Sequence, residues 1–296
     1  MPAWFDANLV SVLNGLAIGS MLFILAVGLS LVFGMMDVLN LAHGALFLAG
    51  AYLGYLLVGR DPSWAGFGTA VALAVVVGLL AGGALQALTE PLSRRSHLDQ
   101  ALLTLGVALV LAELLSLLFG NDPQSVAAPP GLNGSTTVLG VVYPVYRLAL
   151  IGVGAVLALA VYVVVERTRL GLLVRATVAD RDMVSAVGVD ERLVKAAVFG
   201  LGSVLAVLAG VLGAPIYGAQ PGLDVTVLIL ALVVVVIGGL GSVRGALVGA
   251  LLVGQVETLG RSLLPDLASF LLFGPLALVL IMRPQGLFGS RIEARA

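Results

Sequence analysis

The stretch Glu166–Lys195, ERTRLGLLVRATVADRDMVSAVGVDERLVK, decides the fold because it is a charged island between two long apolar runs. Its basic residues are Arg167, Arg169, Arg175, Arg181, Arg192 and Lys195. A segment of this polarity cannot lie in the hydrocarbon core of a bilayer, so it predicts a water-side loop between two membrane spans. The basic side chains place this loop, called the charged island below, in the cytoplasm, where it can contact a soluble partner.

The composition extends this interpretation to the whole chain. Hydrophobic residues make up 60% of the 296 residues and charged residues 10%, whereas a soluble domain is about one-quarter charged. The long apolar runs favour membrane helices over a β-barrel, whose strands would alternate in short segments. A net charge of -1 gives no polybasic surface for nucleic acid, and the absence of cysteine excludes disulfides and thiolate metal sites. We therefore expect residues 1–296 to form one all-α domain, a polytopic transmembrane helix bundle.

The apolar runs locate the spans, because a helix needs about 20 apolar residues to cross a bilayer. The candidates are 9–33, 39–58, 65–89, 100–119, 145–165, 196–214, 224–240, 244–260 and 263–282. This pattern predicts eight or nine crossings, because 224–260 can hold two spans or one span plus a half-helix.

The orientation follows from the arginines and the lysine. Basic residues cluster after the third, fifth and last predicted spans, and placing these regions in the cytoplasm puts eleven basic residues inside and three outside. The N-terminus then lies outside, the C-terminus lies inside, and residues 120–143 form an external loop.

Several catalytic classes are excluded. Lys195 is the only lysine and follows Val194, whereas a Walker A P-loop requires Gly-Lys, so any ATPase that drives this chain is another chain. The sequence has no H-E-x-x-H and no G-x-S-x-G motif. His43 and His97 are the only histidines, which argues against a metal cluster. We expect a non-enzymatic chain without a cofactor or metal of its own.

A first broken segment, GMMDVLNLAHG, follows the first span at Gly34. Asp37, Asn40 and His43 recur every three residues, so on a helix they would share one face. Polar groups between two apolar runs commonly face a bundle interior or an aqueous pathway, and the alternative is an interfacial turn capped by a polar side chain. We interpret Asp37 as a cap, and Asn40 and His43, with Gly44 beside them, as pathway residues.

A second broken segment, IGGLGSVRG, spans 237–245. Its candidate pathway residues are Gly238, Gly239, Gly241, Ser242 and Arg244. Three glycines destabilise a continuous helix by roughly 1 kcal/mol each relative to alanine, and Ser242 can cap the helix that follows. Such a helix start favours an anionic group. A tight turn at the inner surface, with Arg244 reaching lipid phosphates, is the alternative.

The two broken segments begin similar sequences. LAHGALFLAGAYLG (Leu41–Gly54) resembles SVRGALVGALLVGQ (Ser242–Gln255), and each places His43 or Arg244 directly before Gly-Ala-Leu. The similarity reflects either a duplication, which transporters often contain, or chance in an Ala- and Gly-rich chain.

The charged island itself predicts a short helix. Ala176, Met183 and Val187 form an apolar stripe at helical spacing, and Gly188 can terminate the helix. Such a helix either docks in a groove on a partner or lies on the membrane surface.

Three ordered motifs resemble one family nearly end to end. GLAIGSMLFILAVGLSLVFGMMDVLNLAHGALFLAGAYLG (Gly15–Gly54) resembles the opening of LivH-type permease subunits of branched-chain amino-acid ABC importers, with V-x-N-x-A-H-G at Val38–Gly44. R-A-x-x-x-x-R-x-M-A-x-x-x-G appears at Arg175–Gly188, with Asp180 and Val184 in place of the usual Asn and Ala. G-G-x-G-S-x-x-G-A appears at 238–246, with Arg244 at a position that is often Pro, Leu or Phe.

The resemblance implies a multi-pass subunit of a bacterial inner-membrane importer that works by alternating access. Its partners would be a LivM-like second permease, two cytoplasmic ATP-binding subunits that hold ATP and Mg, and an extracytoplasmic substrate-binding protein. The implied ATPase-coupling residues of this chain are Arg175, Ala176, Asp180, Arg181, Met183 and Gly188.

The sequence is also compatible with two alternative functions. Urea and short-chain amide importers have similar permeases, so the same machine could carry either cargo. An ion-coupled secondary transporter usually needs paired intramembrane carboxylates, and only Glu113 and Glu257 are available.

Overall fold

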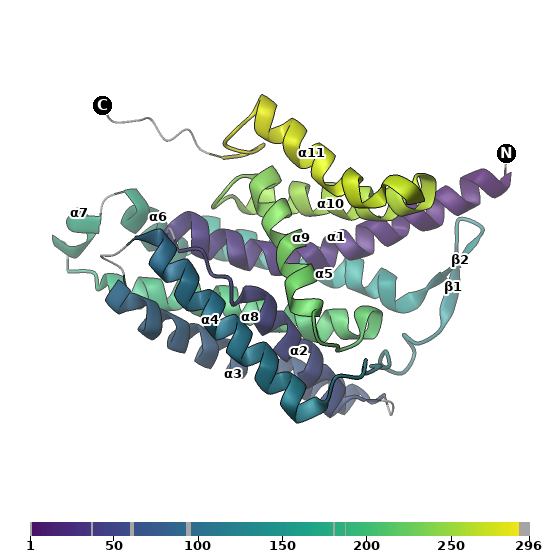
Figure 1. Cartoon of the computed structure of the whole chain (residues 1–296), viewed down its shortest axis with the longest axis horizontal. Helices are drawn as coiled ribbons and strands as arrows, with labels where there is room; N and C mark the ends of the chain where they lie inside the picture. The colour runs from purple at the N-terminus through teal and green to yellow at the C-terminus, as the bar shows by residue number, and fades with distance from the viewer. Residues whose placement is uncertain are drawn as a thin grey trace.

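The structure is a computed structural model that describes residues 2–36, 38–59, 62–92, 96–179, 181–186 and 188–289. The described residues form the expected all-α bundle (Figure 1). Its α-helices are α1 (Pro2–Met36), α2 (His43–Leu57), α3 (Trp64–Thr89), α4 (His97–Phe119), α5 (Val145–Arg167), α6 (Arg169–Ala179), α7 (Arg181–Ala186), α8 (Glu191–Tyr217), α9 (Leu223–Gly238), α10 (Val243–Leu263) and α11 (Ala268–Met282). Two short 3-10 helices, η1 (Glu90–Leu92) and η2 (Pro265–Leu267), follow α3 and α10.

Each predicted span coincides with a helix, but the helices fall into two classes. Six are long and apolar enough to cross a membrane, and they lie within α1, α3, α4, α5, α8 and α10. Three apolar helical segments are shorter, namely α2, α9 and Phe273–Met282 in α11. A helix of 15 or 16 residues is only about 22–24 Å long, less than the hydrocarbon thickness of about 30 Å. The chain is a multi-pass membrane protein in which two short helices, α2 and α9, adjoin the predicted breaks.

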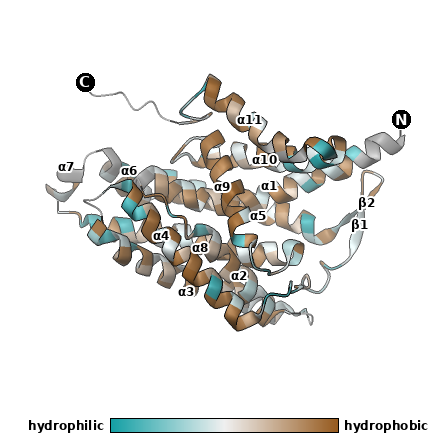
Figure 2. Ribbon diagram, viewed as in Figure 1, coloured by the Kyte–Doolittle hydropathy of each residue, from teal (hydrophilic) through white to brown (hydrophobic). Residues whose placement is uncertain are grey.

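Helices α1 and α8 form the centre of the bundle. In the most apolar 18-residue stretch of each helix, 83% of α1 and 78% of α8 is buried inside the bundle. The corresponding share in α3, α4 and α5 is only 17–22%. Figure 2 shows that α3 and α4 are nevertheless hydrophobic along most of their length. A helix that is apolar and exposed belongs against lipid or another membrane subunit, so α3, α4 and α5 form the outer layer of this chain.

Helix α9 has an unusual direction. In Figure 1 it runs across α1 rather than along it. Its first turn packs on α2, where a Cβ added to Gly44 would overlap the carbonyl oxygen of Asp224, and its last turn packs on α10, where Gly238 and Gly245 meet backbone to backbone. One short helix thus joins the two broken segments.

The two ends of the bundle carry different structures. The segment predicted as an external loop contains an unpredicted hairpin. Its strand β1 (Ser135–Val138) is antiparallel to β2 (Val141–Pro144), with Ser135 opposite Pro144. Figure 1 places this hairpin and the N-terminus at one end and α6 and α7 at the other. Behind the hairpin, the Tyr143 hydroxyl donates to Asn14 Oδ1 at 3.0 Å. Burial raises the pKa of Tyr143, which keeps the phenol a neutral donor.

The charged island folds differently from the prediction. It contains two helices, α6 and α7, instead of one short helix. The buried positions Gly171, Val174 and Thr177 define the packed face of α6, so tertiary contacts with the bundle, rather than the predicted stripe, select which face is buried. Gly188, with φ of +85°, follows α7 and donates its N–H to the Ser185 carbonyl, as expected for a helix terminator. Val187 lies outside the described residues.

Candidate functional site

The first broken segment is not helical between α1 and α2. The prediction that its polar residues share a helix face is wrong, because residues 38–40 have no helical structure; Asp37 lies outside the described residues. Asn40 Oδ1 accepts the N–H of Ala42 at 3.1 Å, and the Asn40 carbonyl accepts the N–H of His43 at 3.3 Å. An amide side chain that bonds the nearby backbone competes with helix formation. Asn40 therefore shapes the turn before α2, but it does not cap the helix, because the N-cap is Ala42 and no side chain caps it.

A residue on another helix holds this segment in place. Thr104 on α4 is fully buried, and its Oγ1 donates to the Leu39 carbonyl at 3.0 Å and accepts the Leu41 N–H at 3.1 Å. These bonds satisfy backbone groups that would otherwise be orphaned in an apolar bundle. Thr104 was not predicted, because a lone threonine in an apolar run gives no distinguishing signal.

His43, the first residue of α2, is fully buried. Its Nε2 lies 2.9 Å from the carbonyl oxygen of Leu25, in the middle of α1. A carbonyl oxygen only accepts, so Nε2 carries the hydrogen and Nδ1 is left with a free lone pair. Nδ1 has no partner among the described residues. His43 thus fixes α2 to α1 with one nitrogen and presents an unused acceptor with the other.

Two side chains of the first break keep an unsatisfied polar atom. Among the described residues, Asn40 Nδ2 and His43 Nδ1 are buried without a partner. The other such atoms are Tyr52 Oη, farther along α2, and Gln100 Oε1, Ser203 Oγ and Gln255 Oε1 on other helices. Buried polar groups are normally paired, and exceptions commonly mark a functional position. The first break therefore keeps unused hydrogen-bonding capacity inside the bundle.

The second broken segment matches its prediction as a helix break. Helix α9 ends at Gly238 and α10 begins at Val243. Between them Gly239 and Gly241 have φ of +97° and +73°, a left-handed region that favours glycine. Ser242 is the N-cap of α10 and accepts the Gly245 N–H at 3.0 Å. The predicted cap is confirmed.

This second break is closed by the chain itself. Ser30 Oγ on α1 accepts the Gly241 N–H at 3.1 Å. The N–H groups of Leu287 and Phe288 donate to the carbonyls of Ile237 and Gly238 at 2.8 and 2.9 Å. The last carbonyls of a helix need partners, and here a segment after α11 supplies them. Neither Ser30 nor this segment was predicted from the sequence.

Arg244 lies at the start of α10 and is exposed in the chain. Its Nη2 donates to the Tyr162 hydroxyl on α5 at 3.2 Å, and its guanidinium carbon lies 5.5 Å from the centre of the Tyr162 ring. These contacts link α10 to α5. They do not connect Arg244 to Asn40 or His43.

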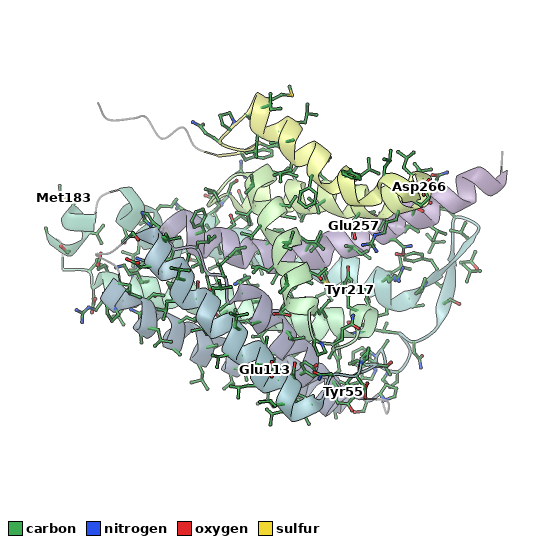
Figure 3. The ribbon with its side chains drawn as sticks, in the orientation of Figure 1. Tyr55, Glu113, Met183, Tyr217, Glu257 and Asp266 are labelled. Carbon is green, nitrogen blue, oxygen red and sulfur yellow. The ribbon has the colours of Figure 1, made fainter. Side chains whose placement is uncertain are left out.

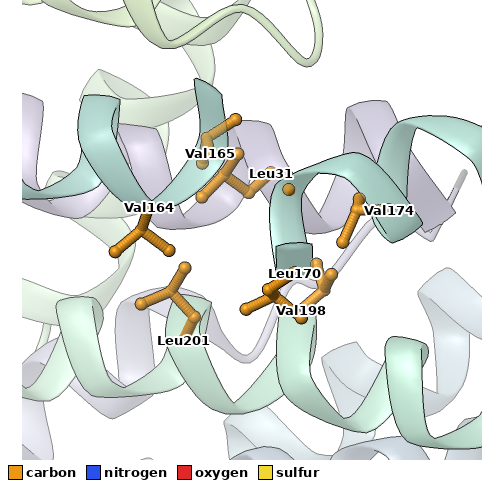
Figure 4. Close-up of a pocket in the computed structure, with 8 residues that line it drawn as sticks. Leu31, Val164, Val165, Leu170, Val174, Val198 and Leu201 are labelled. Atoms are coloured by element: carbon orange, nitrogen blue, oxygen red, sulfur yellow. The ribbon is translucent and has the colours of Figure 1, made fainter. Parts of the chain in front are cut away.

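Helix α6 has a defined seat on the bundle. Figure 4 shows a small apolar pocket where α6 meets α1, α5 and α8. Its lining residues are Leu31, Val164, Val165, Leu170, Gly171, Val174, Val198 and Leu201. Gly171 sits so close to the Val165 carbonyl that a Cβ would overlap it. Helix α6 therefore packs directly on the two central helices, α1 and α8, and on α5 of the outer layer.

Charged side chains form ion pairs at both ends of the island. Arg175 Nη1 donates to the Val165 carbonyl and forms an ion pair with Glu166 at 3.7 Å. At the start of α8, the buried Lys195 pairs with Glu191 at 3.0 Å and with Glu90, after α3, at 4.0 Å. Arg175, predicted to contact a partner, is thus engaged within the chain.

Helix α7 protrudes from this seat. Met183 is 63% exposed, and Figure 3 places it at the far tip of the molecule. Ala176 is half-buried, and Val184 packs inward. Arg181 begins α7, and Asp180 lies outside the described residues. An exposed methionine next to an anchored helix is suited to contact another protein.

The intramembrane carboxylates are separated. Glu257 forms an ion pair with Arg261, one turn later on α10. Glu113 is exposed on α4, and Figure 3 shows the two acidic residues far apart on different helices. The described part of the chain contains no cluster of acidic residues and histidines that could hold a metal ion.

Comparisons with known proteins agree with this architecture. The model of the family described as "Branched-chain amino acid transport system / permease component" matches residues 11–280. The chain is 29% identical over 295 residues to the high-affinity branched-chain amino acid transport system permease protein BraD of Pseudomonas aeruginosa, covering 95% of each chain. It is 28% identical to the corresponding permease protein LivH of Escherichia coli K12, covering 98% of each. A probable LivH of Methanocaldococcus jannaschii is 26% identical over 92% of this chain and 88% of the relative. No solved structure matches the chain.

Proposed function

The chain belongs to the family of permease components of branched-chain amino acid transport systems, and from that membership we propose that it is the LivH-type subunit of an ATP-binding-cassette importer. Acting as one transmembrane domain, it carries leucine, isoleucine or valine into the cytoplasm by alternating access. ATP and Mg are bound by separate partner subunits, and this chain holds no cofactor. Relatives named as high-affinity branched-chain amino acid permeases support this substrate class.

The observation that carries the proposal is the seating of the charged island. Helix α6 is wedged against α1, α5 and α8, and α7 extends from it with Met183 exposed. If a soluble ATPase binds α7, closure of the ATPase subunits in the cytoplasm would move α6 and thereby tilt the helices on which α6 packs. The contact residues on this chain are Ala176, Asp180, Arg181, Met183 and Gly188, whereas Arg175 holds α6 on the bundle.

The partners follow from the two ends of the molecule. We place α6 and α7 in the cytoplasm with two ATP-binding subunits, and the hairpin end outside with a substrate-binding protein. The N-terminus is then outside and the C-terminus inside, in the inner membrane of a bacterium. The exposed apolar layer of α3, α4 and α5 is available to a LivM-like second permease and to lipid.

The first break offers the best position for the substrate. Asn40 and His43 present unused polar atoms there. Beside them, Ala42 and Leu46 line an apolar groove of about 670 Å³ between α2, α3 and α4. A branched aliphatic side chain suits such a groove through burial of its apolar surface. Urea has no apolar group to place there, so this observation favours an amino acid over urea.

Purification from the native membrane tests the assembly. We expect the tagged chain to recover two P-loop ATPases and a second permease, identified from their peptides after mild crosslinking. The recovered complex, reconstituted in proteoliposomes with the accompanying binding protein, should accumulate radiolabelled leucine only when ATP is enclosed on the ATPase side. Recovery of the chain alone, together with leucine uptake driven by an ion gradient, would contradict the importer assignment. Urea uptake in preference to leucine would support the importer assignment but identify urea as its substrate.

A double substitution tests the coupling contact. Arg181→Ala with Met183→Ala should separate ATP hydrolysis from uptake, so that the amount of leucine transported per ATP falls at least tenfold. Membrane insertion should be unchanged. A comparison variant replaces Thr136 and Thr137 by alanine in the exposed hairpin, where the substrate-binding protein is proposed to dock. A docking defect there should lower uptake and ATP hydrolysis together and leave this ratio unchanged. A normal ratio in the Arg181/Met183 variant would contradict the assignment of α7.

A further inference from the structure

We infer that Asp224 and Tyr52 form a subsite for a small cationic group, the ammonium of the transported amino acid. This inference rests on the proposed function and adds a specific recognition element to it. Neither residue was a site candidate from the sequence.

Asp224 lies inside the bundle rather than at its surface. It is the second residue of α9 and only 8% exposed. Its carbonyl oxygen packs on Gly44, next to His43, whose ring is bonded to the middle of α1. The first turn of α9 thus meets the first turn of α2 at the depth where the unused polar atoms of the first break lie.

The carboxylate of Asp224 has a stabilising dipole but no countercharge. Its position in the first turn of α9 favours a negative charge, because unsatisfied N–H groups point toward it. Among the described residues no basic side chain forms an ion pair with it, although pairs are found at Glu90, Glu166 and Glu257. A buried charge without a countercharge is costly and marks function in a membrane segment. The missing complement is a cation.

Tyr52 supplies the second polar contact. Its side chain is 1% exposed, and its hydroxyl has no partner among the described residues. Tyr52 lies on α2, the helix whose first turn packs against the Asp224 carbonyl oxygen at Gly44. An ammonium has three N–H donors, so a carboxylate and a phenol oxygen can share it. Tyr52 therefore extends the subsite along α2, two turns beyond Gly44.

An aromatic group fixes the phenol. The Tyr52 ring stacks on Phe119 at a centroid distance of 4.6 Å, and Tyr55 meets the same Phe119 edge-on at 6.2 Å. Figure 3 places Tyr55 toward the end of the bundle away from Met183, the end assigned to the outside. A substrate that arrives from outside would meet these rings before it reaches His43. The order of groups suits a zwitterion that enters with its ammonium held at Asp224.

The experiment uses the purified importer complex with its native partners. Wild type, Asp224→Asn, Asp224→Glu and Tyr52→Phe are compared, with Asp266→Asn in the exposed η2 as the matched control. We expect leucine uptake to fall at least tenfold in Asp224→Asn and several-fold in Tyr52→Phe, with partial recovery in Asp224→Glu. Uptake by Asp266→Asn should equal that of wild type.

Thermal unfolding of the same complexes identifies the ligand. Millimolar leucine should raise the unfolding temperature of the wild-type complex and of Asp266→Asn, but not that of Asp224→Asn. 4-Methylpentanoate, which lacks the ammonium, should not protect, and replacing choline chloride with sodium chloride should not protect either. Protection by 4-methylpentanoate equal to that by leucine would overturn the subsite, and protection by sodium that requires Asp224 would assign the carboxylate to a free ion instead.

The outcomes separate the two levels of the proposal. Full uptake by Asp224→Asn in a complex whose wild type transports leucine would overturn the subsite alone. Absence of ATP-dependent leucine uptake in the wild-type complex would instead overturn the importer function. If Asp224→Asn does not assemble, the decision falls on Tyr52→Phe and on the two ligand controls with the wild-type complex.

Discussion

The two broken segments of this chain look alike in sequence and differ in how their polar groups are satisfied. Each contains a titratable or basic residue, His43 or Arg244, directly before Gly-Ala-Leu. In each, the glycine that follows, Gly44 or Gly245, packs against one end of α9. At the second break, Ser30 and the segment after α11 bond the exposed backbone groups. At the first break, Thr104 bonds the backbone, but side-chain atoms of Asn40 and His43 remain unpaired.

The difference shows that a helix break alone does not identify a transport pathway. Glycines and polar residues predict both breaks equally well. The two breaks differ in whether their polar groups find hydrogen-bond partners within the chain. We therefore propose that the first break serves the substrate, and that Gly238, Gly239, Gly241 and Ser242 form a joint that holds α9 on α10. Arg244 braces this joint against Tyr162.

The largest expected effect tests what the two breaks share. Gly44→Ala and Gly245→Ala each introduce a Cβ that overlaps backbone at one end of α9. Overpacking of this kind costs roughly 3 kcal/mol, so we expect a large loss of folded protein in detergent extracts followed by size-exclusion chromatography. Gly106→Ala is the matched control, because a Cβ there meets nothing within 4 Å. A normal yield of either test variant would contradict the described seating of α9.

The next effect concerns the support of the first break. Thr104→Val keeps the side-chain shape but leaves the Leu41 N–H and the Leu39 carbonyl without their bonds. A buried unsatisfied group costs about 1–3 kcal/mol, so the unfolding temperature of the chain should fall clearly. Thr69→Val is the matched control, since that hydroxyl bonds only the carbonyls of its own exposed helix turn. Equal melting of the two variants would show that Thr104 does not hold the first break.

How much of this could be predicted from the sequence depends on the range of the interactions. The spans follow from apolar runs, because bilayer thickness fixes their length. The cap at Ser242 follows from local chemistry. Thr104 and Ser30 could not be found, because each bonds a segment 63 or 211 residues away and a hydroxyl in an apolar run carries no local signal. The division of the charged island into α6 and α7 depends on the seat formed by α1, α5 and α8, which no periodicity within the island reveals.

A third prediction separates transport from folding at the first break. Asn40→Ser keeps an oxygen that can accept the Ala42 N–H, since serine and asparagine side chains both bond nearby backbone groups in turns, but it removes the unpaired amide donor. Leucine uptake by the reconstituted complex should fall about tenfold, which corresponds to about 1.4 kcal/mol, while the yield of folded complex stays unchanged. Normal uptake would remove Asn40 from the pathway and leave it only its role in the turn.

The smallest expected effect comes from the corresponding substitution at the second break. Ser30→Ala removes the acceptor for the Gly241 N–H, and a single hydrogen bond contributes about 1 kcal/mol to stability. We expect a slightly lower unfolding temperature, with leucine uptake per folded complex unchanged, because the second break only joins α9 to α10. Ser20→Ala on the same helix is the matched control, since that hydroxyl bonds its own helix at Leu16. If Ser30→Ala instead reduced uptake as strongly as Asn40→Ser, the joint would move during transport, and the second break would belong to the pathway with the first.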